Sequence, residues 1–158
     1  REKLDKTYKE VNKNFSEFFK RLFMGGRAEL QLMGDEILDT GLQVSAQPPG
    51  KKNTTINLLS GGEKALTAIS LIFALFKLNP SPFCVMDEVD APLDDTNTSN
   101  FCSLVKEMAE KTQFLIVTHN RITMEIAEQL VGVTQQELGV SRIVEVDMRD
   151  IDDMELAY

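Results

Sequence analysis

The segment 57-NLLSGGEKALTAISLIFALFKL-78 predicts one long helix with a well-defined first residue. Ser60 and Glu63 stand three positions apart in the pattern of a capping box, so we expect the helix to begin at Ser60. Gly61 and Gly62 then supply its first amides, and without side chains there a phosphate could approach the positive end of the helix. The four residues alone fit an ordinary capped turn equally well, so their context has to decide.

Length and composition indicate one globular domain with a buried core. The chain has 158 residues, of which 42% are hydrophobic and 27% are charged. The predicted helix is apolar on nearly all sides, so we expect it to lie inside that domain.

The charge and the cysteines narrow the function classes. A net charge of −8 argues against nucleic acid binding over the whole surface, although local clusters such as Lys9, Lys13, Lys20 and Arg21 could still contact phosphates. No apolar run is long enough to cross a membrane, and the sequence shows no leader. The two cysteines form no CxxC pair, which fits a reducing compartment. We therefore expect a cytoplasmic protein without a membrane partner.

The first segment, residues 1–22, predicts a helix. Its apolar residues recur at steps of four and three, as in a coiled-coil seam: Leu4, Tyr8, Val11, Phe15, Phe18 and Leu22. Only about three heptads are present, so an amphipathic helix that packs on its own domain is the alternative. We assign 1–22 to the end of a coiled-coil arm and 23–158 to a separate lobe.

The remaining pattern predicts strands of two kinds. Alternating residues at 28–32 and 42–46 predict a small antiparallel sheet before the long helix. The apolar runs 83–86 and 114–117, joined by a helix at about 96–111, predict parallel strands buried on both faces. A short helix at 122–130 and strands at 131–134 and 143–146 complete the expected elements.

Three polar residues follow the two parallel strands. Asp87 and Glu88 come directly after the first strand, and His119 follows the second. Because the carboxyl ends of parallel strands meet at one edge, where α/β sheets bind ligands, we expect these side chains to lie close together. Adjacent carboxylates suit a division of labour in which one holds Mg²⁺ and the other orients a water for attack on a phosphate. A lone acidic pair or histidine would more often be structural, but the three groups together with the helix start predict a nucleotide site.

These motifs occur in a recognisable order. LLSGGEKALTAISLIFAL, FCVMDEVDAPLDD and FLIVTHN resemble the C-terminal half of an ABC-type ATPase head, and their details are similar to the SMC (structural maintenance of chromosomes) family. The resemblance covers about residues 15–147. It implies an α/β fold, namely the C-terminal half of a P-loop NTPase-like head. That half would contain a parallel sheet with flanking helices, a small antiparallel sheet and the stump of a coiled coil.

The resemblance also implies a role for each matching residue. The residues expected to contact the nucleotide, through the signature motif and the D-loop, are Ser60, Gly61, Gly62, Glu63 and Asp94. Asp87 matches the Walker B aspartate associated with Mg²⁺, Glu88 the catalytic glutamate that activates water, and His119 the switch histidine that senses the γ-phosphate. The implied cofactors are therefore ATP and Mg²⁺.

A P-loop is missing from this set of motifs. The Gly50-Lys51 pair is the only Gly-Lys in the chain, but Ser45 stands where the first glycine of the motif belongs and Lys52 where its hydroxyl belongs. In SMC proteins the P-loop lies in an N-terminal segment, beyond a long coiled coil and a hinge. We therefore expect half of an ATPase, inactive without that N-terminal lobe.

The resemblance implies several partners in chromosome condensation and partition, and an association with the nucleoid if the source is bacterial. These are the N-terminal lobe of the same protein, a second SMC head, the winged-helix domain of a kleisin subunit, and DNA through the full complex. The strands before Ser60 and after Arg142 would form the platform for the kleisin. The alternative is half of an ABC-type ATPase of DNA repair or recombination, which a zinc hook in place of a hinge would reveal. A transporter domain fits less well because its P-loop and signature motif lie in one continuous chain.

Overall fold

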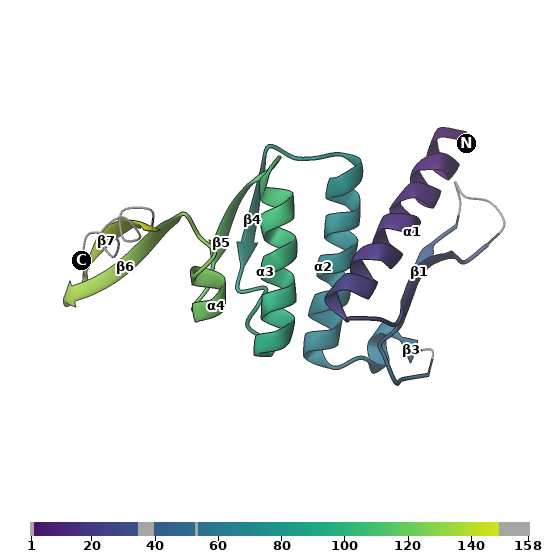
Figure 1. Cartoon of the computed structure of the whole chain (residues 1–158), viewed down its shortest axis with the longest axis horizontal. Coiled ribbons are helices and arrows are strands. Elements are labelled where there is room, and N and C mark those ends of the chain that lie inside the picture. The colour runs from purple at the N-terminus through teal and green to yellow at the C-terminus, as the bar shows by residue number, and fades with distance from the viewer. Residues whose placement is uncertain (1, 35–39, 53, 149–158) are drawn as a thin grey trace, which may run out of the picture.

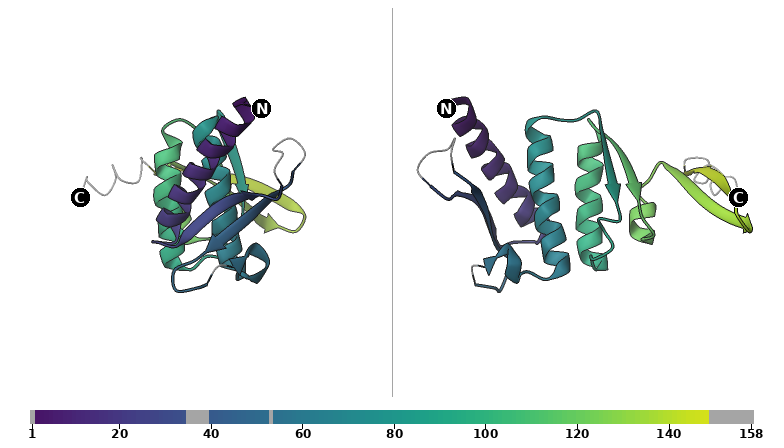
Figure 2. Two further views of the ribbon diagram at one scale, coloured as in Figure 1. Left: turned by 90° about the vertical axis from the view of Figure 1, so that its right-hand side faces the viewer. Right: turned by 180° about the vertical axis from the view of Figure 1, so that it is seen from behind.

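The helix expected from the capping box is α2, which spans Gly61–Leu78. In this computed structural model, residues 2–34, 40–52 and 54–148 are described. Figures 1 and 2 show α2 and α3 in the middle of the molecule, with α1 and β1 toward one end and the β6–β7 hairpin at the other. The elements are α1 Glu2–Leu22, β1 Arg27–Leu32, β2 Leu42–Gln47, β3 Thr54–Thr55, a 3-10 turn Ile56–Leu58, α2, β4 Phe83–Asp87, α3 Asp95–Ala109, β5 Gln113–Val117, α4 Arg121–Met124, β6 Gln129–Glu137 and β7 Val140–Asp147.

Helix α2 is capped as predicted but is not buried on all sides. Both hydrogen bonds of the capping box are present, and the helix ends at Leu78, with Asn79 as its C-cap before Pro80. One face is buried in the core through Leu66, Ile69 and Phe73. A stripe on another face is exposed, and it consists of Ala68, Ile72 and Leu75. The expectation of complete burial was therefore wrong for this chain, because nothing among the described residues covers that stripe.

Helix α1 joins the same core through its second half. Val11, Phe15, Phe18, Phe19 and Leu22 are buried, whereas Leu4 near the first turn is 42% exposed. The ring of Phe18 packs edge-on against Phe73 of α2 at 6.4 Å between centroids. This half of α1 thus behaves as an amphipathic helix on its own domain, and a continuation into a coiled-coil arm stays a prediction.

The predicted antiparallel sheet before α2 is confirmed. Strands β1, β2 and β3 pair in that order, with Leu30 opposite Val44 and Ser45 opposite Thr55. Gly26 allows the tight entry from α1, because its φ is +77° and a Cβ there would lie 2.4 Å from the Gln47 carbonyl oxygen.

Strands β4 and β5 are parallel, as predicted, but only one face of their sheet is covered. Phe83 lies opposite Gln113 and Asp87 opposite Val117, with α3 as the connection. Cys84 and Met86 point into the core and are buried. The outward apolar residues are Phe83 (63% exposed), Val85 (59%), Leu115 (60%) and Val117 (51%). The expected burial of both faces was therefore wrong for this chain.

The last elements differ most from expectation. The helix predicted at 122–130 ends at Met124, and strand β6 begins already at Gln129. Strand β6 pairs with β7 in an antiparallel hairpin that projects from the rest of the molecule (Figure 1). The strands predicted at 131–134 and 143–146 are therefore confirmed and are longer than expected, because Gln129 and Leu130 of the predicted helix pair with Asp147 and Val146 instead. Within the described residues no helix has the length and apolar character to cross a membrane, and both cysteines are free.

Candidate functional site

The edge formed by the carboxyl ends of β4 and β5 brings the three predicted groups together. Asp87 is the last residue of β4, and Glu88 continues the ladder by donating its amide to the Val117 carbonyl at 2.8 Å. The Nδ1 atom of His119 lies 3.6 Å from Oε1 of Glu88. These two side chains are 75% and 59% exposed, so they are open to a ligand. The predicted proximity of Glu88 and His119 is confirmed, while a contact of Asp87 with either group and the chemical roles of all three stay predictions.

Glu88 has a left-handed backbone conformation, with φ of +47°. For a residue with a side chain this region costs on the order of 1–3 kcal/mol and is common at functional sites. The conformation turns the chain sharply after β4, and the Ala91 amide closes the turn onto the Glu88 carbonyl at 3.2 Å. The turn presents Glu88 toward His119 instead of continuing the strand.

The start of α2 forms a second polar region. Gly61 is exposed, and a Cβ on it would meet nothing within 4 Å. Gly62 instead rests against the turn after β4, since a Cβ there would lie 2.7 Å from the Pro92 carbonyl oxygen. The two glycines are therefore not equivalent: Gly61 leaves room for a ligand, and Gly62 allows close packing.

The carboxylate of Glu63 is already occupied. It accepts the Ser60 amide at 2.8 Å and pairs with Nζ of Lys51 at 2.7 Å. The hydrogen bond from Lys51, followed by that from the Ser60 backbone, lowers the pKa of the Glu63 carboxyl. An anion in front of α2 would thus meet the exposed amide end of the helix, with a lysine ammonium nearby. Sequence reasoning missed Lys51, which had been considered only as part of a failed P-loop.

Asp94 has a structural task in this chain. It is the N-cap of α3, and its Oδ1 accepts the Asn97 amide at 2.8 Å. Its second oxygen accepts from the Asn97 side chain at 3.1 Å. The predicted contact of Asp94 with a nucleotide stays a prediction.

Asp90 was not singled out from the sequence, although it belongs to the same acidic motif. It is 1% exposed, and its Oδ2 accepts hydrogen bonds from the hydroxyls of Thr118 at 2.6 Å and Thr123 at 2.5 Å. Thr118 directly precedes His119. The signal that could have revealed Asp90 is an acid two positions after Glu88, with threonines flanking the histidine.

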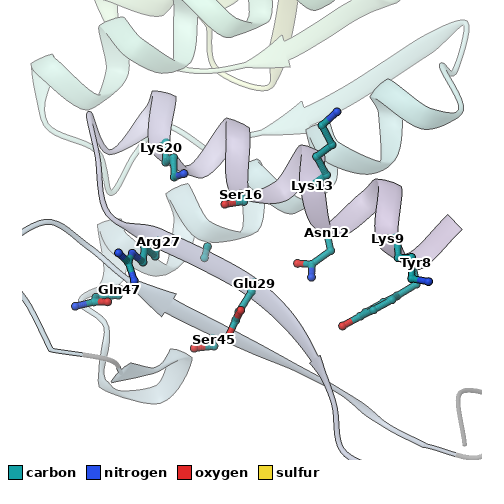
Figure 3. Close-up of a pocket in the computed structure, with 11 residues that line it drawn as sticks. Tyr8, Lys9, Asn12, Lys13, Ser16, Lys20, Arg27, Glu29, Ser45 and Gln47 are labelled. Atoms are coloured by element: carbon teal, nitrogen blue, oxygen red, sulfur yellow. The ribbon is translucent and has the colours of Figure 1, made fainter. Parts of the chain in front are cut away.

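A groove of about 500 Å³ lies elsewhere, between α1 and the β1–β2 sheet (Figure 3). Three of the basic residues noted in the sequence line it, namely Lys9, Lys13 and Lys20, together with Arg27. Arg21 is not part of this groove but pairs with Glu107 at 2.6 Å. No residue of the β4–β5 edge lines the groove, so the groove and the candidate site are separate.

A family model supports the resemblance to the SMC family. Residues 4–142 match the model described as "RecF/RecN/SMC N terminal domain". The chain is 67% identical over 145 residues to the chromosome partition protein Smc of Burkholderia pseudomallei, covering 92% of this chain and 12% of that protein. It is 50% identical over 151 residues to the protein of the same name from Myxococcus xanthus, with coverages of 95% and 13%. The chain thus spans about an eighth of the length of these relatives.

Solved structures agree with the family model. The Smc head domain of Pyrococcus furiosus, with an extended coiled coil and bound to the C-terminal domain of ScpA, superposes with a TM-score of 0.90 at 36% identity. That match covers 95% of this chain and 38% of the other. A protein solved in work on ATP-driven dimerization and DNA-stimulated activation of SMC ATPases gives a TM-score of 0.81 at 36% identity, with coverages of 95% and 94%. The chain therefore belongs to the RecF/RecN/SMC family, and its fold is that of an SMC head domain.

Proposed function

We propose that this chain is the C-terminal lobe of an SMC ATPase head and supplies part of an ATP-hydrolysing site. The observation that carries the proposal is the meeting of Asp87, Glu88 and His119 at one sheet edge in a chain without a P-loop motif. Such a constellation can act on a triphosphate only if another segment holds the β- and γ-phosphates. The matching family model carries the name of an N-terminal domain, so the assignment to the C-terminal lobe depends on these motifs.

The surroundings of Gly50 and Lys51 support the absence of a P-loop. A P-loop joins a strand to a helix and wraps its amides around phosphates. Here the pair lies between strands β2 and β3, in a turn closed by the Lys51 amide on the Pro48 carbonyl at 3.2 Å. The ammonium of Lys51 is bound to Glu63. This lysine is therefore engaged at the start of α2 and does not form a phosphate cradle of its own.

The uncovered apolar surfaces support a missing N-terminal lobe. Parallel sheets are normally covered on both faces, and a sheet of two strands is too small to stand alone. In this chain the outward face of β4–β5 and the stripe of α2 are exposed. We infer that the P-loop-bearing lobe covers these surfaces and extends the sheet beside β4 or β5. That lobe would then hold ATP next to Glu88 and His119.

The residues fit a Mg²⁺ site that is completed from outside. Within the described part of the chain, no group of three or more His, Cys, Asp or Glu residues could hold a metal ion. Mg²⁺ is usually held by one or two carboxylates, waters and substrate phosphates, so the exposed Asp87 suits such a partial site. When bound, Mg²⁺ would neutralise charge on the β- and γ-phosphates. Glu88 would orient the attacking water and accept its proton, and His119 would contact the γ-phosphate.

The start of α2 would serve a different ATP molecule. The exposed start of the helix at Gly61 could receive the phosphates of ATP bound to a second head, beside the ammonium of Lys51 that Glu63 already holds. Hydrolysis would then require two heads to engage. We further propose that DNA acts through the assembled complex, because the chain carries a net charge of −8.

Reconstitution tests the split site. The chain alone should show neither tight Mg-ATP binding by calorimetry nor turnover, whereas the chain co-expressed with a P-loop-bearing SMC lobe should hydrolyse ATP. Glu88→Gln in the reconstituted head should abolish turnover and trap ATP-bound dimers, detected by light scattering. Glu110→Gln, an exposed glutamate at the end of α3, is the matched control. Tight binding or turnover by the isolated chain, or full activity of the Glu88→Gln head, would contradict the proposal.

The β6–β7 hairpin favours a second function as a docking platform for a kleisin. Both faces of the hairpin carry exposed apolar side chains: Val131, Val133 and Ile143 lie on one face and Val144 and Val146 on the other. A two-stranded hairpin of this kind is only marginally stable without a cover. The Pyrococcus furiosus head was solved with the C-terminal domain of ScpA bound. We propose that residues after Arg142 receive the corresponding winged-helix domain. The β1–β2 sheet, which was expected to share this platform, lies toward the opposite end of the molecule and is left out of the proposal (Figures 1 and 2).

Two variants separate the two proposed interfaces. Val144→Asp on the hairpin should abolish capture of a kleisin winged-helix domain by this chain without nucleotide. Leu75→Asp on the stripe of α2 should leave that capture intact and instead weaken binding of the P-loop-bearing lobe. If Val144→Asp captures the kleisin domain as well as Leu75→Asp does, the hairpin is not part of the kleisin-binding surface.

A further inference from the structure

A buried carboxylate joins the two loops that carry Glu88 and His119. Asp90 lies two residues after Glu88, and at 1% exposure it is one of the most deeply buried side chains of the molecule. No lysine or arginine in the described part of the chain pairs with it; its oxygen accepts two hydroxyl hydrogen bonds instead. A buried acid is costly unless its oxygens are satisfied, so these two bonds hold the surrounding loops in a defined arrangement.

The first of these bonds reaches the residue before His119. The Thr118 hydroxyl donates to Oδ2 of Asp90 at 2.6 Å and accepts the Asn120 amide at 2.9 Å. His119 lies between these two anchored residues. Its own side chain is 75% exposed and has one described contact, the 3.6 Å approach to Glu88. The position of the imidazole therefore depends on the backbone on either side of it.

The second bond ties the same carboxylate to helix α4. The Thr123 hydroxyl donates to Oδ2 of Asp90 at 2.5 Å, and Thr123 is 2% exposed. Asn120 caps α4 by accepting the Ile122 amide at 2.9 Å. The segment from Thr118 to Thr123 is thus anchored to Asp90 at both ends.

On the other side, Asp90 belongs to the turn against which α2 begins. The Leu93 amide donates to the Asp90 carbonyl at 2.9 Å, and the Pro92 carbonyl lies against Gly62. One residue therefore connects the backbone around His119 with the turn between Glu88 and the start of α2.

We propose that Asp90 is a positioning residue, which acts through the Thr118 hydroxyl to hold His119 beside Glu88. The expected effect on kcat rests on the proposed ATPase function, whereas the hydrogen bonds that position His119 do not. Loss of the Thr118 hydroxyl frees the His119 backbone and leaves one fewer donor on a buried carboxylate. A displacement of about 1 Å at a catalytic group can lower a rate by about a hundredfold. We expect a fall in kcat of about tenfold to a hundredfold, with KM for ATP within about twofold.

Matched threonine variants test this in the reconstituted head. Thr118→Val removes the hydroxyl, and Thr118→Ser restores it and should restore kcat. Thr112→Val is the control, because Thr112 is also buried and donates to the Ser81 carbonyl at 2.8 Å, at the opposite end of β5. It should lower stability without lowering kcat. The proposal is overturned if the kcat of Thr118→Val equals that of the unmodified head. It is also overturned if the kcat of Thr118→Val falls no further than the kcat of Thr112→Val.

A second readout does not depend on ATP. His119 is the single histidine of the chain, so selective labelling of histidine gives one imidazole signal by NMR. Thr118→Val should shift or broaden that signal, while Thr118→Ser and Thr112→Val should leave it unchanged. An unchanged signal in Thr118→Val would overturn the positioning role. If the unmodified reconstituted head does not hydrolyse ATP, the ATPase proposal fails, whereas the NMR comparison still decides whether the Thr118 hydroxyl, which links Asp90 to this loop, positions His119.

Discussion

The two faces of the β4–β5 sheet contrast sharply. On the inner face Cys84 and Met86 are buried against the core that α3 completes, whereas on the outer face Phe83, Val85 and Leu115 are more than half exposed. Both faces carry apolar residues along the middle of the strands. The chain therefore encodes strands for a fully buried sheet but itself covers only one side of it.

The same contrast continues along α2. Phe73 is fully buried and packs against the rings of Phe18, Phe101 and Phe114. Ile72, its neighbour in sequence, is 42% exposed. At the start of the helix, Gly62 packs against the turn after β4 while Gly61 faces open space. The sheet and the helix thus each have a buried apolar side and an exposed one. Substitutions on the two sides should differ in their effect on stability.

The largest difference is expected between two phenylalanines. Phe73→Ala removes a ring that three other rings contact, so it should lower the free energy of unfolding by about 3–5 kcal/mol. Phe83→Ala alters a side chain that is 63% exposed. In this chain alone, it should change the free energy of unfolding by less than about 0.5 kcal/mol. Urea denaturation followed by circular dichroism measures both.

In a complex with a P-loop-bearing lobe, the effects of Phe73→Ala and Phe83→Ala should differ less than in the chain alone. If that lobe covers the outer face, Phe83→Ala should weaken its binding, measured by calorimetry. A Phe83→Ala chain that binds the lobe normally would show that the lobe does not cover the outer face of β4–β5. The outer face would then be exposed in the complex as well.

A smaller difference is expected between the two glycines. Gly62→Ala places a Cβ 2.7 Å from the Pro92 carbonyl oxygen, so the turn or the helix start must move, at a cost of about 1–3 kcal/mol. Gly61→Ala meets no atom within 4 Å and removes backbone freedom from the unfolded chain, so stability should stay equal or rise by up to about 1 kcal/mol. Thermal unfolding of the two variants checks the order. Equal destabilisation would mean that the glycines are required for conformation and not for packing.

The smallest effect concerns the pH dependence of stability. The pKa of Glu63 is lowered by Lys51 and the Ser60 backbone, so its contribution is present above the unfolded value and is lost as pH falls through the folded one. Part of the stability should therefore disappear below about pH 4.3, the ordinary value for glutamate. Urea midpoints measured from about pH 6 down to about pH 3 should fall less steeply with pH for Glu63→Gln than for the unmodified chain. Lys51→Met should reproduce part of that change, and an unchanged slope in both would contradict the assignment.

Much of the site could be predicted because it depends on local rules. The capping pattern of Ser60 and Glu63 defines a helix start by neighbouring hydrogen bonds, and both bonds are present. Two apolar runs joined by a helix imply parallel strands with their ends on one edge, and Glu88 and His119 do lie 3.6 Å apart there. Neither inference needs knowledge of distant contacts.

Other features could not be predicted because they depend on what packs nearby. Residues 125–130 were expected to be helical, but the pairing of β6 with β7 starts at Gln129 and overrides that preference. The two roles of Gly61 and Gly62 differ only through the distant Pro92 carbonyl. Asp90 looks like an exposed acid in the sequence, and its burial follows from two threonines that the fold brings to it.

By itself, the sequence determined the helix start, the parallel strand pair and the order of the acidic and histidine residues, since each follows from spacing along the chain. The tertiary structure alone decided which apolar faces are covered and which carboxylate is buried. Burial is a property of surfaces that meet across long sequence separations, and a periodic pattern reports only that a face is apolar, not whether a neighbour is present to cover it.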